Sequence, residues 1–137
     1  MAKRVSELYD DTFQETLRAS ELVFVDFYTD WCGPCKAVAP VIERAAKEYD
    51  GRIVFGRLNT EGTPETARRY RVSSVPTLVL FRDGESVTRL GGFQSDAALS
   101  ASLSRYAPPL PVGTAADMPD AGEPGRGLLA RLFRRSP

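Results

Sequence analysis

Between Leu22 and Tyr49 the sequence changes abruptly from the pattern of a buried strand to that of an amphipathic helix. Residues 23–28, VFVDFY, are rich in β-branched and aromatic side chains, which is typical of a strand covered on both faces. From Cys35 onward, apolar residues recur three and four positions apart, which predicts a helix with one apolar face. That face would carry Ala39, Ile42, Ala45, Ala46 and Tyr49. A buried strand that leads directly into a helix indicates an α/β fold.

The two cysteines of the chain lie at this junction, in Trp31-Cys32-Gly33-Pro34-Cys35. The N–H groups of a first helical turn are unpaired and carry partial positive charge, so they would stabilise a thiolate at Cys32 and make it a nucleophile. Gly33 permits a close turn, and Pro34 suits the first helical turn because its missing N–H costs nothing there. Two intervening residues bring the sulfur atoms within bonding distance, so the pair can cycle between dithiol and disulfide.

A metal site is the main alternative for two cysteines at this spacing. Zinc takes about four ligands, and the chain has two cysteines and no histidine, so one chain alone does not supply a zinc site. Zinc or an iron–sulfur cluster shared between two chains stays open as a minor alternative. A purely structural disulfide is disfavoured, because so short a loop constrains the unfolded chain little. The pattern therefore favours a redox-active pair without a metal.

Turn and capping signals predict the remaining elements. We expect an edge strand within residues 3–8, and Asp10 as the cap of a helix over residues 12–19. The Asp83-Gly84 pair predicts a hairpin turn between two strands. The other predicted strands are 52–58, 75–81 and 86–90, and the other predicted helices are 65–70 and 97–106.

The sequence resembles the thioredoxin family over roughly Lys3 to Ala107. The resemblance rests on WCGPCK after the apolar strand, on Val75-Pro76-Thr77 and on Gly91-Gly92. It implies a thioredoxin fold, which is α/β with a mixed central sheet of about five strands flanked by helices, in one domain at residues 1–107. It also implies a cis peptide bond before Pro76, facing the cysteines. The implied activity is the reduction of disulfides in client proteins by dithiol–disulfide exchange.

The resemblance also assigns roles to the central residues. Cys32 would attack the client disulfide, and Cys35 would attack Cys32 to release the client. Asp26, an isolated acid in the apolar strand, would exchange a proton with Cys35 through water. Alternation could instead place Asp26 on a solvated face, but strands of α/β folds are covered on both faces, which disfavours that alternative. The chain has no histidine, so acid–base chemistry must use a carboxylate, a thiol or water.

Further positions would surround the cysteine pair and dock the client. The rim implied by the resemblance consists of Trp31, Gly33, Pro34, Val75, Pro76 and Gly92. The backbone of Val75 would pair with an extended client segment as an added strand. Gly92 would let the client backbone approach closely, although a flexible turn is the simpler interpretation of Gly91-Gly92.

Two residues would support this site. Pro40 would bend the helix that follows the cysteines. Arg57 stands where the family commonly has a lysine. An arginine keeps its charge at any working pH and cannot act as a tunable base, but it can lower the pKa of Asp26. Tyr28 replaces a tryptophan common in the family, and we expect it not to touch the chemistry directly.

The composition changes at Pro108. Residues 108–137 hold six of the ten prolines and resemble a Pro/Gly-rich linker that cannot build a core, so we expect a disordered tail. Residues 126–137 form a short basic, apolar segment with four arginines and no acid. Either the segment has no function, or it docks weakly on an anionic membrane surface or an acidic partner. A thioredoxin-like binding or assembly subunit recruited through this tail is therefore the alternative function.

Charge and hydropathy bear on partners and compartment. The 18 basic residues balance the 18 acidic ones, so bulk charge gives no case for nucleic-acid binding. The first residues lack an apolar signal region, and no run of about 18 apolar residues occurs, so we expect a cytoplasmic protein. We expect no bound cofactor and, with nothing to indicate an oligomer, a monomer. The resemblance implies an NADPH-dependent thioredoxin reductase as electron donor. An oxidant or isomerase is disfavoured, because oxidising relatives usually place a histidine where Gly33-Pro34 stands.

Overall fold

The computed structural model describes residues 4–107, and they form five strands and four helices. The predicted linker and the basic segment 126–137 lie outside the described residues. The elements along the chain are β1 (Val5–Glu7), α1 (Phe13–Ala19), β2 (Leu22–Tyr28), α2 (Gly33–Glu48), β3 (Val54–Asn59), α3 (Pro64–Arg69), β4 (Thr77–Arg82), β5 (Glu85–Gly91) and α4 (Asp96–Leu103).

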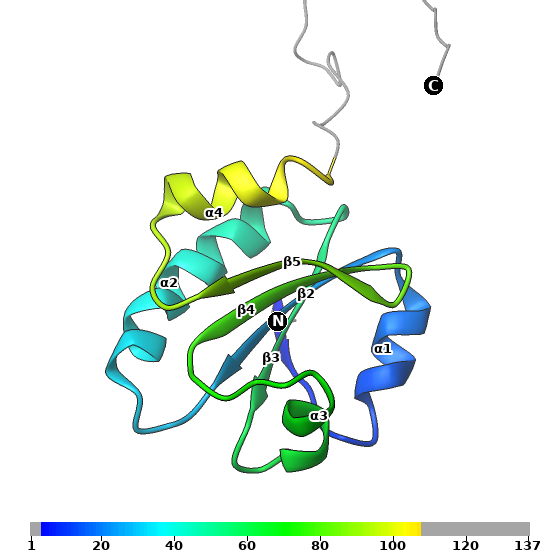
Figure 1. Ribbon diagram of the computed structural model, residues 1–137. Helices are drawn as coiled ribbons and strands as arrows, with labels where there is room; N and C mark the ends of the chain where they lie inside the picture. Colours follow the sequence, from blue (N-terminus) through cyan, green and yellow to red (C-terminus); the bar gives the residue numbers. More distant parts are fainter. Residues whose placement is uncertain (1–3, 108–137) are drawn as a thin grey trace, which may run out of the picture. The chain divides into compact units, whose positions relative to one another are not determined.

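The five strands form one mixed sheet in the order β1-β3-β2-β4-β5, with β2 at its centre (Figure 1). β1, β3 and β2 run parallel to one another, whereas β4 pairs antiparallel with β2, and β5 pairs antiparallel with β4. Parallel neighbours need crossover connections, and α1 and α2 supply them. The predicted α/β architecture with about five strands is therefore confirmed.

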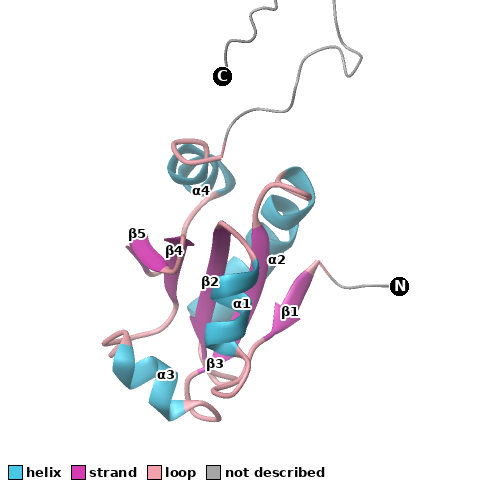
Figure 2. Ribbon diagram, turned by 90° about the vertical axis from the view of Figure 1, so that its right-hand side faces the viewer, coloured by secondary structure: helices cyan, strands magenta, loops and turns pink. Residues whose placement is uncertain are grey.

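Helices cover both faces of this sheet (Figures 1 and 2). One core cluster joins α2 and α4 to the sheet, and the other joins α1 and the segment after α3 to its opposite face. All seven residues of β2 are consequently buried. The first cluster includes Phe24, Val38, Ile42, Phe55, Leu78, Leu80 and Leu99, and the second includes Phe13, Leu17, Val25, Phe27, Leu58, Val79 and Phe81.

The packing of the edge strand β1 against β3 depends on a glycine in β3. Gly56 pairs with Ser6 of β1, and a Cβ atom built on Gly56 would lie 2.6 Å from Cδ1 of Leu8. Any larger residue would force the side chain of Leu8, which is buried in the second core cluster, to shift. A glycine here therefore lets the three-residue strand β1 and the chain after it pack against β3.

One capping prediction is wrong. Asp10 does not cap α1, whose N-cap is Thr12. Instead, Oδ1 of Asp10 accepts hydrogen bonds from the backbone N–H of Thr66 (2.9 Å) and from its hydroxyl (2.6 Å), both in α3. Tertiary packing brings this carboxylate beside the first turn of a helix far along the chain, where the exposed N–H groups need an acceptor. The other predicted elements are present, with ends shifted by one to three residues.

Candidate active site

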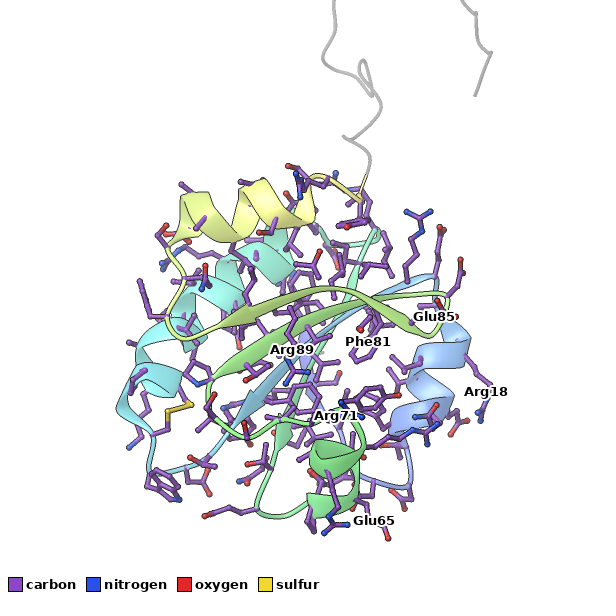
Figure 3. All side chains as sticks on the ribbon, in the orientation of Figure 1. Arg18, Glu65, Arg71, Phe81, Glu85 and Arg89 are labelled. Atoms are coloured by element: carbon purple, nitrogen blue, oxygen red, sulfur yellow. A yellow bond between two sulfur atoms is a disulfide. The ribbon has the colours of Figure 1, made fainter. Side chains whose placement is uncertain are left out.

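The cysteine pair lies where β2 has ended and α2 begins. Cys32 is the N-cap residue of α2 and has an extended backbone, and Pro34 lies in the first helical turn, as predicted. The two cysteines form a disulfide, visible as the yellow bond at the start of α2 (Figure 3). The backbone N–H of Cys35 points at Sγ of Cys32 over 3.1 Å. A negative charge on that sulfur would thus face an unpaired helix N–H, which is the arrangement that stabilises a thiolate.

The two sulfur atoms have different surroundings. Sγ of Cys32 lies 3.7 Å from the carbonyl oxygen of Val75, in the loop before β4. Cys35 instead lines a pocket of about 290 Å³. The lining residues are Tyr28, Thr29, Asp30, Cys35, Lys36, Ala39 and Arg57. A client that approaches along the Val75 loop would therefore meet Cys32 first, while Cys35 faces a hollow large enough for water.

The predicted rim residues converge around Cys32 from three parts of the chain. Trp31, Gly33 and Pro34 flank it at the start of α2, and the Val75–Pro76 peptide bond beside it is cis. Gly92 follows β5 with a φ of +79°, a conformation that favours glycine, and its N–H donates to the carbonyl of Pro76 over 2.9 Å. The two rim segments beside β4 and β5 are thus hydrogen-bonded to each other.

The loop that carries the cis bond is anchored before it reaches the site. Arg89 of β5 donates to the carbonyl oxygens of Tyr70 and Arg71 over 2.6 Å each (Figure 3). Arg71 has a φ of +57°, which is uncommon for a residue with a side chain. After the turn, the hydroxyl of Thr77 donates to the carbonyl of Ser74 over 2.6 Å. These contacts fix both ends of the loop beside Cys32.

Two aromatic side chains are exposed here, one in the rim and one next to it in the sequence. Trp31 is 70% exposed, and its indole N–H donates to Oε2 of Glu61 over 2.9 Å. Phe93, directly after Gly92, is 52% exposed. Glu61 was not among the predicted site residues, because nothing in the local pattern of the loop after β3 relates it to a tryptophan 30 residues earlier.

Asp26 lies in the middle of β2 and is 2% exposed, so the solvated alternative is wrong. Burial raises the pKa of its carboxyl to about 7, while the positive charge of Arg57 lowers it and the negative charge of Glu7 raises it. Its Oδ1 atom has no hydrogen-bond partner among the described residues. An acid with this pKa can both take and release a proton near neutral pH.

Arg57 is the register partner of Asp26 on β3, yet its guanidinium turns toward β1. Its Nε lies 3.9 Å from Oε1 of Glu7, and its central carbon lies 3.9 Å from the centre of the Tyr28 ring. The hydroxyl of Tyr28 donates to Oε2 of Glu7 over 2.8 Å. Tyr28, which was expected to stand apart from the chemistry, therefore contacts the residue beside the buried acid. Glu7 was not among the predicted site residues.

Pro40 lies inside α2, as predicted, and its missing N–H leaves the carbonyl of Lys36 without its helical partner. The bend attributed to Pro40 stays a prediction.

Within residues 4–107, no group of three or more His, Cys, Asp or Glu side chains is placed to hold a metal ion. None of the helices described is both long and apolar enough to cross a membrane.

Comparison with known proteins agrees with this geometry. The sequence model of the family described as Thioredoxin matches residues 4–105 of the chain. This chain belongs to the thioredoxin family. It is accordingly a protein-disulfide reductase that works by dithiol–disulfide exchange, and its redox-active group is its own Cys32–Cys35 disulfide. The partners of the family are disulfide-containing proteins and thioredoxin reductase.

Individual thioredoxins match most of the described residues. The chain is 45% identical over 96 residues to a thioredoxin from Mycobacterium bovis. The aligned region covers 70% of this chain and 83% of that protein. It is 40% identical over 108 residues to the chloroplastic M-type thioredoxin of Spinacia oleracea, covering 78% of this chain but only 60% of the spinach protein. The structure of a mutant thioredoxin from Halobacterium salinarum NRC-1 superimposes with a TM-score of 0.70 at 33% identity, over 81% of this chain and 99% of that one.

Proposed function

We propose that this thioredoxin reduces client proteins with Cys32 as the attacking cysteine and Cys35 as the resolving one. The observation that carries this assignment is the asymmetry of the two sulfur atoms. Cys32 is the N-cap of α2 and lies beside the Val75–Pro76 loop, whereas Cys35 faces the pocket that Arg57 also lines. The first position suits a thiolate stabilised by the helix start, and the second suits a thiol that must lose its proton inside the protein.

The proposed reaction has two displacement steps. The Cys32 thiolate bonds to one sulfur of the client disulfide, and the other client sulfur leaves as a thiolate that takes a proton from water. Cys35 then loses its proton and attacks Sγ of Cys32, so the mixed disulfide breaks and the first client sulfur leaves as a thiolate. Two electrons pass from the cysteine pair to the client. Thioredoxin reductase returns two electrons to the disulfide, and we propose NADPH as their source.

Asp26 is the proposed proton acceptor for Cys35. Its pKa of about 7 lets the carboxylate form at neutral pH and bind a proton when the thiol releases one. The pocket that Cys35 lines offers water a place beside the thiol, and Arg57, the register partner of Asp26, lines the same pocket. Arg57 influences this step only through its charge, because an arginine does not give up its proton in the working range.

The rim is proposed to hold the client as an extended segment. The backbone of Val75 would pair with it, and Gly92 would let its backbone come close. Trp31, Gly33, Pro34 and Pro76 would complete the contact, and Pro40 would shape the helix behind it. The exposed ring of Phe93 extends this apolar border on the β5 side.

Trapping tests the two cysteine roles. We expect Cys35→Ser to accumulate a stable mixed disulfide with a disulfide-containing client, because nothing then attacks Sγ of Cys32. Cys32→Ser should accumulate none. Non-reducing gel electrophoresis and mass spectrometry of the adduct measure both variants. Equal trapping by the two variants would overturn the assignment.

The redox potential tests the direction of the reaction against the oxidant and isomerase alternative. We expect the Cys32–Cys35 couple to be more reducing than the glutathione couple, so that electrons flow to clients. Equilibration with a dithiothreitol or glutathione series, followed by the fluorescence of Trp31, measures it. A potential at or above that of glutathione would instead support an oxidant.

We propose that the protein works in the cytoplasm, because a disulfide reductase needs a reducing compartment. We propose also that it works as a monomer. The linker and basic segment proposed for residues 108–137 lie outside the described residues. Recruitment through this tail therefore stays a prediction.

Co-sedimentation with anionic vesicles tests the weak membrane contact proposed for residues 126–137. If deletion of that segment leaves sedimentation unchanged, the contact does not exist.

A further inference from the structure

We propose that Glu7 is a positioning residue for proton transfer: its carboxylate faces Arg57 and partly neutralises it, and so lets Asp26 keep a proton near neutral pH. The effect on catalysis rests on the role proposed above for Asp26. The effect on the charge of Asp26 does not, because it follows from how three strands place their side chains.

The three residues form one row across the sheet. Glu7 of β1 pairs with Arg57 of β3, and Arg57 pairs with Asp26 of β2. Two residues earlier on the same strands stand Val5, Phe55 and Phe24, which belong to the core cluster under α2 and α4. Side chains two residues apart share a face of a sheet, so the row Glu7–Arg57–Asp26 lies on the face that α2 covers.

The contacts on Arg57 hold it toward Glu7. Oε1 of Glu7 lies 3.9 Å from Nε of Arg57, and Oε2 accepts the hydroxyl of Tyr28 over 2.8 Å. The guanidinium carbon lies 3.9 Å from the ring centre of the same tyrosine, within cation–π range. Burial, and then the hydrogen bond to Glu7, raise the pKa of Tyr28 to about 12, so its phenol remains a donor at neutral pH. Glu7 thus faces the arginine at the outer limit of an ion pair, without a hydrogen bond to its Nε among the described residues, and the Tyr28 ring packs against the guanidinium.

The row is buried at one end and open at the other. Asp26 is 2% exposed, whereas the side chains of Arg57 and Glu7 are 37% and 33% exposed. Within residues 4–107, no ion pair within 4.0 Å joins Arg57 to Asp26. The arginine therefore acts on the buried carboxyl through space, and a negative charge on its outer side weakens that action.

This compensation matters because an arginine is permanently charged. An uncompensated cation beside Asp26 would favour the carboxylate and would move its proton exchange away from neutral pH. Arg57 does lower the pKa of Asp26, and Glu7 raises it. The other charged groups near the pocket are Lys36 of α2 and Asp30 after β2, which are of opposite sign, while β4 presents the neutral Leu78 opposite Asp26.

Glu7→Gln is the central test. Glutamine keeps the length of the side chain and an oxygen that can accept the Tyr28 hydroxyl, but it removes the charge. We expect the titration midpoint of Asp26 to fall by roughly half a pH unit to one unit. The carbon-13 shift of the Asp26 carboxyl in the oxidised protein measures it without any client, so this readout stands even if Asp26 has no role in exchange.

A second variant separates charge from structural damage. Arg57→Gln should move the same midpoint upward, because it removes the cation of the row. Opposite shifts for Glu7→Gln and Arg57→Gln support the proposal, whereas a general loosening of the sheet would move both midpoints in one direction. Glu85→Gln is the matched control, since Glu85 lies at the end of β5 remote from Gly91 and the disulfide (Figure 3).

The kinetic readout links the row to the reaction. The pH midpoint for resolution of a mixed disulfide by Cys35 should fall in Glu7→Gln by the same amount as the titration midpoint. In an Asp26→Asn background, Glu7→Gln should cause no shift. An unchanged or raised Asp26 midpoint in Glu7→Gln, or a shift that persists without Asp26, would overturn the proposal.

Discussion

Asp26 makes the folded protein less stable as the pH rises from about 4 to about 7, whereas an acid with a lowered pKa would do the opposite. Its pKa in the folded protein, about 7, is higher than the ordinary value of 3.8, because burial disfavours the carboxylate. Below about pH 4 the carboxyl is protonated in both the folded and the unfolded protein. Between about pH 4 and about pH 7 the carboxyl releases its proton in the unfolded protein but keeps it in the folded protein. The contribution of Asp26 to folding is therefore greatest below pH 4, falls as the pH rises to 7, and is constant above that.

Replacement of this acid should accordingly stabilise the protein at high pH. We expect Asp26→Asn to raise the free energy of unfolding by about 4 kcal/mol above pH 7, from a difference of about three pKa units. Below pH 4 the difference from the unmodified protein should shrink toward zero. Urea unfolding of both proteins between pH 3 and pH 9 measures it. Parallel stability curves over this range would show that the pKa of Asp26 is the same in the folded and the unfolded protein.

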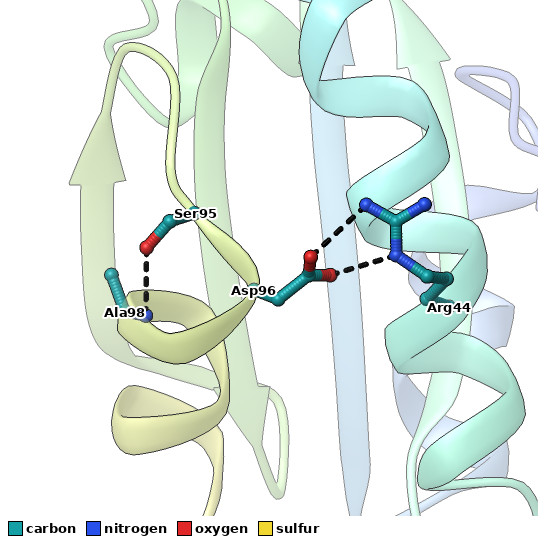
Figure 4. Close-up of polar contacts among 4 residues, drawn as sticks. All are labelled: Arg44, Ser95, Asp96 and Ala98. Carbon is teal, nitrogen blue, oxygen red and sulfur yellow. Dashed lines mark hydrogen bonds and ion pairs between the residues drawn. The ribbon is translucent and has the colours of Figure 1, made fainter.

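The helices α2 and α4 pack together through apolar side chains and are joined at the surface by polar contacts. Arg44 and Asp96 form two hydrogen bonds of 3.0 Å each, and the hydroxyl of Ser95 accepts the backbone N–H of Ala98 over 3.1 Å (Figure 4). The side chains of Arg44 and Asp96 are each 60% exposed, so water and salt screen their attraction. The cap at Ser95 satisfies a helix N–H that would otherwise lack a partner inside the protein.

The capping contact should be measurable as stability. We expect Ser95→Ala to lower the free energy of unfolding by about 1 kcal/mol, because alanine offers no acceptor to the first turn of α4. Ser102→Ala, within the same helix, is the control and should not destabilise, since alanine is the better helix former there. Chemical unfolding of both variants compares them. An equal loss in the two variants would mean that the cap contributes nothing.

Helix caps and turns follow from neighbouring residues, whereas contacts between elements do not. The hairpin at Asp83-Gly84 was predicted correctly, and both residues have positive φ angles of 52° and 86°. The bond from Asp10 to α3 joins residues 56 apart and was not foreseen. A short polar side chain in a loop can cap whichever helix start packs nearest to it, and only the packing decides which one that is.

For the molecule as a whole, we propose that residues 1–107 form a domain that folds without the rest of the chain. Of the residues described, those in the two larger core clusters lie between Val5 and Ala107. We expect a fragment of residues 1–107 to match the full chain in urea midpoint and in the rate of disulfide reduction. Unfolding curves and an insulin-reduction assay on the two proteins test this. A fragment that unfolds at distinctly lower urea would assign residues 108–137 a structural role.

Much of this protein follows from patterns that are local in the chain. The apolar run before Trp31, the helix after it, and the cysteines at their junction predicted an α/β fold with a redox pair at a helix start. These features depend on neighbours within one helical turn or one strand. Residues that match a known family added the cis bond before Pro76, which local preference alone disfavours.

The tertiary structure decided which distant side chains act together. The register of three strands places Glu7, Arg57 and Asp26 in one row, and the fold brings Glu61 to the indole of Trp31. Alternation along β1 and β3 could have suggested that Glu7 and Arg57 share a face, but not which strands would be neighbours. Burial of Asp26 likewise arises only when α2 covers the sheet. The cysteines supply the chemistry, and the packing around them sets the pH at which their protons move.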